Sequence, residues 1–238
     1  MKLRTQLLSW LTKRPMRTTP EDWQHLRFSF SQFGEDLVLL NYLKAPQGFY
    51  VDVGAHHPVQ FSNTYLLHRR GWRGVNIDAT EEAIARFAQA RPHDVNLVAA
   101  ISDQVQEVEF GTFRSPALNR IYAAGSAELE RQKLEQPKLW QSMTGTRKLT
   151  TRTLAAVLRE VVPAGQPIDF MNIDCEGHDL AVLRSNDWSA YAPQMLAVED
   201  WQEAEESLIV AFLREQHFQL IATCELTRIF QHRQPAAR

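Results

Sequence analysis

Short apolar runs alternate with amphipathic stretches along most of the chain. Runs rich in β-branched and aromatic residues are typical of buried strands, and the stretches between them repeat apolar residues every three or four positions, as helices do. We predict strands over residues 48–54, 74–78, 96–101, 168–174 and 195–199, and helices over residues 63–71, 81–91, 153–162, 178–185 and 203–216. Strands separated by helices at this interval predict parallel βαβ units.

Several element ends are also marked in the sequence. Asn63 precedes a predicted helix as an N-cap, Gly71 follows that helix, and Pro92 ends the next one. Near the C-terminus, residues 218–223 and 227–232 are two strand-like runs joined by a short link. They predict a closing antiparallel pair.

The alternation of strands and helices breaks between residues 114 and 148. This stretch contains Pro116, Gly125, Pro137 and Gly145 around a polar helical segment. It is longer than an ordinary connection between elements. Two interpretations stay open, a lid or substrate-facing insertion and a surface insertion without a function.

The first 27 residues form a separate N-terminal segment ahead of a domain over residues 28–238. Residues 1–20 carry five basic side chains and no acidic one, and Leu3, Leu7 and Trp10 recur at helical spacing. This pattern predicts an amphipathic helix, which either lies on an anionic membrane surface or packs on its own domain. Its apolar stretch is too short and interrupted for a signal peptide or a membrane span.

Composition narrows the class of protein. A chain of 238 residues suits one large domain, and 26 basic against 28 acidic residues give a net charge of −2. This balance argues against a nucleic-acid partner, for which a strongly basic surface is typical. Only Cys175 and Cys224 occur, too few for a disulfide scaffold, so we expect a cytoplasmic protein.

Acidic residues follow four of the predicted strands. Parallel strands buried in a sheet are apolar, and open α/β sheets bind ligands at the carboxyl ends of their strands. Carboxylates gathered at these ends therefore predict a site. They are Asp52, Asp78, Asp174, Glu176, Glu199 and Asp200.

The loop after the first strand indicates the kind of cofactor. Residues 54–59 lack the Gly-x-Gly-x-x-Gly pattern that brings backbone N–H groups against a pyrophosphate, which disfavours an NAD-dependent oxidoreductase. S-adenosylmethionine has no phosphate and needs only one small residue, here Gly54, and an acid on the next strand end. Asp78 follows Asp52 at a spacing of 26 residues and could accept both ribose hydroxyls.

Several sequence blocks occur together in a consistent order. They are SQFGEDL (31–37), YVDVGAHHP (50–58), SNT (62–64), GWRGVNID (71–78), NL (96–97), AIS (100–102), IDF (168–170), IDCEG (173–177) and SNDW (185–188). Over roughly residues 28–200 the chain thereby resembles the FkbM family of S-adenosylmethionine-dependent methyltransferases. The resemblance implies a class I, Rossmann-like α/β fold with a seven-stranded, mostly parallel sheet, a C-terminal antiparallel hairpin and helices on both faces.

The resemblance also implies the cofactor-binding residues. Asp52 and Gly54 would lie under the methionine moiety with Ala55, Asp78 would hold the ribose, and Ser102 would lie near the adenine. Gln32 and Glu35, from the segment before the first strand, would close the site at the methionine end of the cofactor. The complete expected set is Gln32, Glu35, Asp52, Gly54, Ala55, His56, Asn63, Asp78, Ser102 and Asp174.

A divalent metal site is a further expectation. Asp174, Glu199 and Asp200 end neighbouring predicted strands and resemble the metal site of metal-dependent class I O-methyltransferases, some of which act on sugars. Oxygen-only ligands suit Mg²⁺, which would lower the pKa of a bound hydroxyl. The alternative is that these acids contact the cofactor or cap helices.

Methyl transfer to a sugar hydroxyl also calls for a general base. His178 is the first candidate, because it lies at the start of a predicted helix, whose dipole favours the neutral imidazole. His57 is the second candidate, and Glu176 could orient the base or bind substrate. Each histidine could instead be a packing residue.

The resemblance to the FkbM family implies an O-methyltransferase, and we expect it to act on a sugar hydroxyl of a surface glycan or glycolipid. The expected partner is a small-molecule or glycan acceptor, with peripheral contact at the inner membrane surface through residues 1–20. Two alternatives stay open. The chain could methylate a polyketide or other natural-product hydroxyl, or keep the fold as a catalytically silent scaffold.

Overall fold

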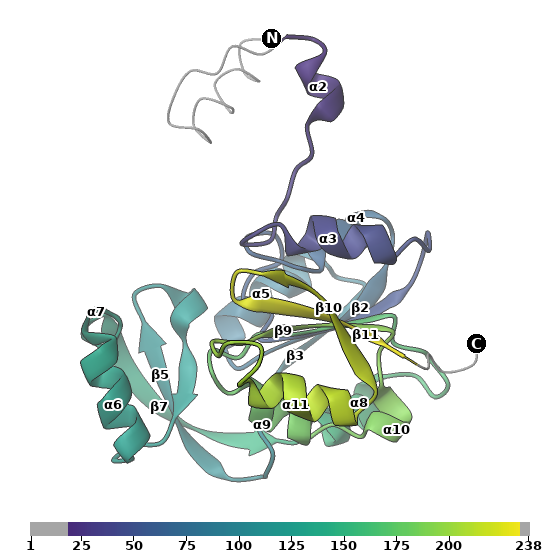
Figure 1. The fold of residues 1–238 in the computed structure, drawn as a ribbon. Coiled ribbons are helices and arrows are strands. Elements are labelled where there is room, and N and C mark those ends of the chain that lie inside the picture. Colours follow the sequence, from purple (N-terminus) through teal and green to yellow (C-terminus); the bar gives the residue numbers. More distant parts are fainter. Residues whose placement is uncertain (1–18, 234–238) are drawn as a thin grey trace.

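The computed structural model describes residues 19–233 (Figure 1). The helix predicted over residues 1–20 lies almost entirely outside the described residues and stays a prediction. The described segment before residue 28 contains one short helix, α2 (Asp22–His25). No described helix is both long and apolar enough to cross a bilayer, and Cys175 and Cys224 are both free.

The main sheet has seven strands in the order β10-β11-β9-β8-β1-β2-β3. Five neighbouring strands, from β9 to β3, run parallel, and β11 is antiparallel to both β9 and β10. The predicted α/β class and the C-terminal antiparallel pair are confirmed, in a sheet that is mixed. The strands are β1 (Phe49–Val53), β2 (Arg73–Asp78), β3 (Val95–Val98), β8 (Phe170–Ile173), β9 (Met195–Glu199), β10 (Phe218–Cys224) and β11 (Thr227–His232).

Helices cover both faces of this sheet (Figure 1). Side chains alternate along β1, so that Tyr50 packs with Leu39 and Leu67 on one face and Val51 packs with Leu158 on the other. The first face holds α3 and α4, the second holds α8, α9 and α11, and α5 packs on β2 and β3. The helices are α3 (Glu35–Tyr42), α4 (Tyr65–Arg69), α5 (Glu81–Ala90), α8 (Leu154–Val161), α9 (Asp179–Arg184), α10 (Trp188–Tyr191) and α11 (Leu208–Glu215).

Two predicted boundaries are wrong for local reasons. The helix predicted from residue 203 begins at Leu208, because the Ser207 side chain accepts the Val210 N–H as an N-cap. The strand predicted over residues 96–101 is divided between two sheets. After β3, the Ala99 N–H donates to the Asp78 carbonyl, and the chain then leaves the main sheet as β4 (Ala100–Ile101).

The stretch predicted as an insertion, residues 114–148, belongs to a second sheet that begins before it, at β4. Its strands lie in the order β4-β7-β5-β6, and Figure 1 shows it with its helices as a teal lobe beside the main sheet. From the sequence only a helical segment was predicted in this stretch, because β7 is largely exposed and its sequence is mostly polar. The added elements are β5 (Glu107–Phe113), η1 (Pro116–Leu118), β6 (Arg120–Tyr122), α6 (Ala127–Glu135), α7 (Pro137–Gln141) and β7 (Met143–Arg152).

Candidate functional site

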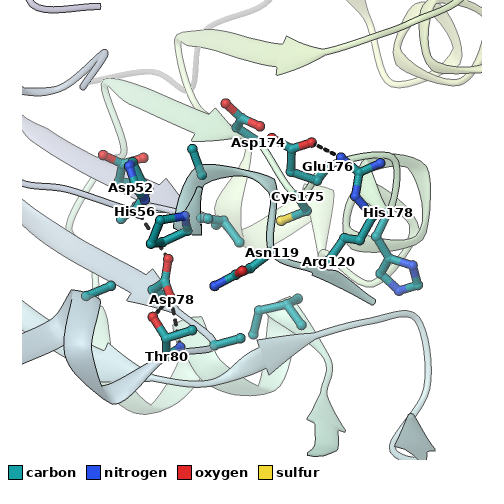
Figure 2. Close-up of a pocket in the computed structure, with 18 of the residues that line it drawn as sticks. Asp52, His56, Asp78, Thr80, Asn119, Arg120, Asp174, Cys175, Glu176 and His178 are labelled. Atoms are coloured by element: carbon teal, nitrogen blue, oxygen red, sulfur yellow. Dashed lines mark hydrogen bonds and ion pairs between the residues drawn. The ribbon is translucent and has the colours of Figure 1, made fainter. Parts of the chain in front are cut away.

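A pocket lies at the carboxyl ends of β1, β2 and β8, and the insertion forms its opposite wall (Figure 2). Asn119 and Arg120 are the polar residues that the insertion contributes. Most of the residues predicted from the sequence line this pocket. They are Gln32, Asp52, Gly54, Ala55, His56, Asn63, Asp78, Asp174, Glu176 and His178.

Gly54 lets the loop after β1 cross the end of β8. Its φ is 76°, and a Cβ added there would lie 1.7 Å from the Asp174 carbonyl oxygen. The N–H groups of Gly54 and Ala55 both donate to the Ile77 carbonyl, at 2.9 and 3.0 Å. This position requires glycine both for its left-handed backbone and for the contact with β8.

The Asp52 carboxylate is buried, with 2% of the residue exposed, and has side-chain partners for both oxygens. Asn172 donates to Oδ1 at 2.9 Å and Thr64 donates to Oδ2 at 2.7 Å. Burial raises the pKa of Asp52. Asn63 donates to Asn172 at 2.9 Å, so the predicted N-cap role of Asn63 is wrong. Thr64 precedes α4 instead, with no side-chain cap.

Arg91 anchors the loop between β1 and α4, a role that the sequence did not reveal. Its side chain is buried at 1% exposure and donates to Thr64, Ser62 and the Pro58 carbonyl. It also donates to Tyr50. In the sequence, Arg91 is only the residue before Pro92 at a helix end, which gives no signal for this role.

Asp78 is largely occupied by its own chain. Oδ2 accepts the His56 N–H at 3.0 Å, and Oδ1 accepts both the N–H and the hydroxyl of Thr80, at 2.8 and 2.6 Å. A carboxylate offers about four acceptor positions, so one remains for a ligand. The expectation that Asp78 accepts both ribose hydroxyls therefore needs correction, because only one can be accepted.

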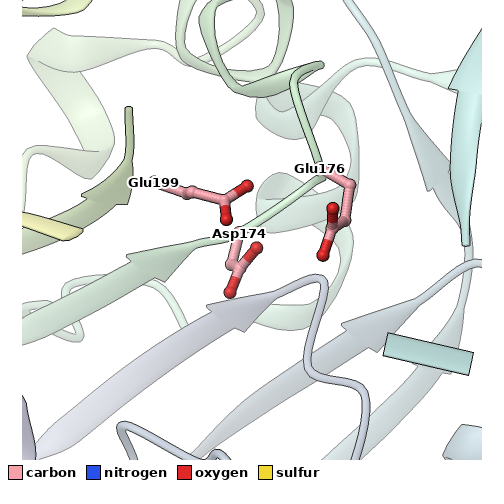
Figure 3. Close-up of side chains that lie close together, drawn as sticks. All are labelled: Asp174, Glu176 and Glu199. Atoms are coloured by element: carbon pink, nitrogen blue, oxygen red, sulfur yellow. The ribbon is translucent and has the colours of Figure 1, made fainter. Parts of the chain in front are cut away.

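Three carboxylates gather beside this pocket, with oxygens of Asp174, Glu176 and Glu199 within 4.8 Å of one another (Figure 3). Burial is the largest cause that raises the pKa of each of the three carboxyl groups. For Asp174 and Glu176 the nearby Glu199 charge is the second cause, and the pKa of Glu176 rises to about 8. Arg120 forms an ion pair with Glu176 across the pocket. The buried Glu199 Oε2 has no hydrogen bond to any described residue.

Asp200 is not part of this carboxylate cluster. It accepts hydrogen bonds from Arg228 at 2.6 Å and from Ser207 at 2.5 Å, so its charge is neutralised between β9, β11 and α11. The expected metal set is corrected here, because Glu176 takes the position given to Asp200. The backbone turn after β8 brings Glu176 there, with a left-handed φ of 56°.

His178 is the N-cap residue of α9, and burial lowers the pKa of its imidazole. Its Nε2 lies 2.9 Å from the Ser102 hydroxyl, which itself donates to Asp103 Oδ1. Because a hydroxyl has one proton, Ser102 accepts from His178 Nε2–H, and Nδ1 is left as the basic nitrogen. Ser102 does not line the pocket, so its expected place near the adenine is corrected to a support for His178.

Two other expected residues serve the local backbone. Nδ1 of His57 accepts the N–H groups of Val59 and Gln60, which closes the turn after β1. The Glu35 carboxylate accepts the Phe33 N–H and the Thr227 hydroxyl. Neither His57 nor Glu35 is among the residues that line the pocket.

Comparisons with known proteins place these observations in a family. The family model described as the methyltransferase FkbM domain matches residues 52–220, more than half of the chain. The crystal structure of methyltransferase FkbM from Methylobacillus flagellatus KT is similar, with a TM-score of 0.48 and 11% identity over 85% of this chain and 48% of that chain. This chain thus spans about half the length of that protein. No curated protein matches this chain. The extent of the family match shows that the chain belongs to the FkbM methyltransferase family.

Proposed function

We propose that this protein is an S-adenosylmethionine-dependent O-methyltransferase of class I fold that methylates a sugar hydroxyl. One observation carries the proposal. A single pocket at the carboxyl edge of the sheet joins a group of carboxylates to an apolar wall, over a loop that only glycine can form. Such a pocket suits a ligand with positive charge at one end and a purine at the other.

The residues present fit this cofactor. Gly54 and Ala55 allow close approach to the loop after β1, and Asp78 keeps one acceptor position for a ribose hydroxyl. Asp174 and Glu176 lie at one end of the pocket, and their raised pKa values mean that a cationic group of the cofactor would displace protons from them on binding. When bound, S-adenosylmethionine supplies an electrophilic methyl group. The protein's part is to orient the acceptor oxygen and remove its proton.

His178 is the proposed proton acceptor. Its pKa is lowered by burial, so the imidazole is neutral near pH 7, and its Ser102 contact leaves Nδ1 free of a proton. Burial supports this role in addition to the position of His178 at the start of α9, which was the reason given from the sequence. Glu176 is held by Arg120 at the same end of the pocket and is assigned to substrate binding.

Magnesium assistance is a second part of the proposal. Asp174, Glu176 and Glu199 offer only oxygen ligands, and Glu199 Oε2 is buried without a partner among the described residues. Titration of the protein with Mg²⁺ tests the site. Binding should be lost in Glu199→Gln and kept in Asp200→Asn, because Asp200 is committed to Arg228. Activity that survives EDTA would remove the metal and leave the methyltransferase assignment standing.

The acceptor and the setting are proposed from the sequence and the family resemblance. A hydroxyl of a surface glycan or glycolipid sugar is the proposed target, reached from the cytoplasmic side of a membrane through residues 1–20. A polyketide hydroxyl is the alternative acceptor. A panel of both acceptor types with labelled S-adenosylmethionine would separate them.

Calorimetric titration with S-adenosylmethionine and S-adenosylhomocysteine is the primary test. The expected result is micromolar binding of both, followed by labelled methyl transfer to an acceptor of the panel. Absence of binding, with and without Mg²⁺, would overturn the enzyme proposal. The catalytically silent scaffold would then become the better description.

A further inference from the structure

We propose that Asn119 binds the ribose of the cofactor, so that the nucleoside is held between the main sheet and the inserted sheet. This inference rests on the proposed function, because it takes S-adenosylmethionine as the ligand. Asn119 lies between η1 and β6 and lines the same pocket as Asp78. The insertion would thus contribute to cofactor binding.

The orientation of the Asn119 side chain is set by its backbone neighbour. The Phe113 N–H donates to Asn119 Oδ1 at 2.9 Å. Since a backbone N–H can only donate, the atom that it meets must be the amide oxygen. The amide nitrogen then points into the pocket, on the side of Asp78 in Figure 2, and it makes no hydrogen bond to a described residue. A fixed donor is therefore directed at the ligand.

Asp78 creates the need for this donor. The ribose has two neighbouring hydroxyls, each able to donate and to accept a hydrogen bond. His56 and Thr80 already occupy three of the roughly four acceptor positions of the Asp78 carboxylate. Asp78 can accept one ribose hydroxyl but, as a carboxylate, cannot donate to a ribose oxygen, so a donor to the ribose oxygens must come from another wall. Asn119 Nδ2 supplies that donor.

Apolar residues of the insertion and its stem indicate where the purine lies. Ala100 and Ile101 of β4, Phe110 of β5 and Ile121 of β6 all line the pocket. Phe110 is buried, and none of the four offers a side-chain polar group. A flat purine suits such a wall. The ribose then falls between this wall and the carboxylate cluster, within reach of Asp78 and Asn119.

The test measures binding of adenosine and S-adenosylhomocysteine by calorimetry to the wild type and to Asn119→Asp. Aspartate keeps an oxygen for the Phe113 N–H and replaces only the donor, so the turn is preserved. We expect affinity for both ligands to fall roughly tenfold, since the hydrogen bond that the amide nitrogen donates to a ribose oxygen is lost. Gln141→Ala, on the exposed side of α7, is the matched control and should bind as the wild type does.

Deoxy analogues locate the contact. Asn119 is expected to contact one of the two ribose hydroxyls. The deoxyadenosine that lacks this hydroxyl, either the 2′-deoxy or the 3′-deoxy analogue, should bind to Asn119→Asp and to the wild type with equal affinity. An unchanged adenosine affinity in Asn119→Asp would overturn the proposal. So would an equal loss for adenosine and both analogues, because Asn119 would then act on the purine or on the fold.

Arg86 of α5 is the competing donor on the pocket wall. Its Nε donates to the Glu82 carbonyl, and its terminal nitrogens could reach a ligand. A loss of adenosine binding in Arg86→Ala, with none in Asn119→Asp, would assign the ribose to Arg86 and overturn the inference. If the wild type binds neither S-adenosylhomocysteine nor adenosine, the proposed function fails, and this inference fails with it.

Discussion

At the scale of single residues, the site depends on a few positions where backbone geometry leaves little choice. Gly54 has a left-handed backbone and no room for a Cβ, and Glu176 adopts a left-handed φ that brings its carboxylate beside Asp174 and Glu199. Non-glycine residues rarely adopt this conformation, and such strain clusters at functional sites. The structure therefore holds the carboxylates together at a cost in local backbone energy.

Gly54→Ala should abolish cofactor binding and lower stability. The left-handed backbone alone costs alanine about 1–2 kcal/mol, and the clash with the Asp174 carbonyl adds to this. Gly125→Ala is the matched control, because Gly125 has a similar φ of 72° with nothing within 4 Å of an added Cβ. Urea unfolding and S-adenosylhomocysteine titration of both variants measure the difference. Equal effects in the two variants would mean that the contact with β8 is unimportant.

The raised pKa of Glu176 predicts how stability depends on pH. Burial and the Glu199 charge raise it from 4.5 to about 8, so the folded protein holds this proton more tightly than the unfolded chain does. The protonated Glu176 side chain therefore adds to the free energy of unfolding below about pH 4.5, and this stabilising contribution is lost as the pH rises toward 8. Urea unfolding in EDTA between pH 5 and 8 should show this decline. Glu176→Gln should make the decline shallower, while Asp174 and Glu199 keep raised pKa values of their own, and an unchanged slope would contradict the assignment.

At the scale of elements, a largely buried ion pair joins the insertion to the loop after β8. Arg120 begins β6, Glu176 follows β8, and both side chains are largely buried. Breaking a buried pair typically costs 3–5 kcal/mol, because one charge is left without a partner. The cost is lower here, since Glu176 can take up a proton. The Arg120 guanidinium binds the Glu176 carboxylate, which is also one of the three proposed metal ligands.

Arg120→Leu should lower stability and tighten Mg²⁺ binding. The stability loss follows from the broken pair, and the gain in metal affinity follows because Glu176 no longer shares its charge with a guanidinium. Unfolding by urea and calorimetric titration with Mg²⁺ measure the two effects. Lys133→Ala, which breaks the exposed pair with Glu130 in α6, should change neither by more than about 1 kcal/mol. Weaker Mg²⁺ binding in Arg120→Leu would argue against competition for Glu176.

At the scale of the whole molecule, the pocket belongs to two sheets. The main sheet contributes its strand ends, and the second sheet contributes the opposite wall through η1, β5 and β6. Among the described residues, those that line the pocket lie between positions 32 and 178. No described residue of the N-terminal segment lines it, so we expect cofactor binding and membrane contact to be separable.

Removal of residues 1–18 should leave the dissociation constant of S-adenosylmethionine unchanged. If the predicted basic helix lies on a membrane, the same truncation should abolish partition onto anionic lipid vesicles, since five cations are removed with it. Sedimentation with vesicles of anionic and of neutral lipid measures the second effect. Partition that is unchanged by the truncation would show that residues 1–18 do not hold the protein at the membrane.

The sequence by itself determined the elements of the main sheet and the core side of the pocket. Local patterns suffice there, because a buried parallel strand is a short apolar run and an acid at its end is visible in one dimension. Asp52, Gly54, Asp78 and Asp174 were identified on this basis. The family resemblance followed from the same blocks.

Only the tertiary structure decided which groups meet across long separations. Three side-chain contacts depend on packing between distant elements, which a local sequence pattern does not contain. They are Arg91 with Thr64, Arg120 with Glu176, and Asp200 with Arg228. The second sheet was missed for the same reason, since β5 and β7 pair across the whole insertion and β7 is largely exposed. Strand propensity depends on such partners, so a strand exposed along most of its length leaves only a weak signal in its own residues.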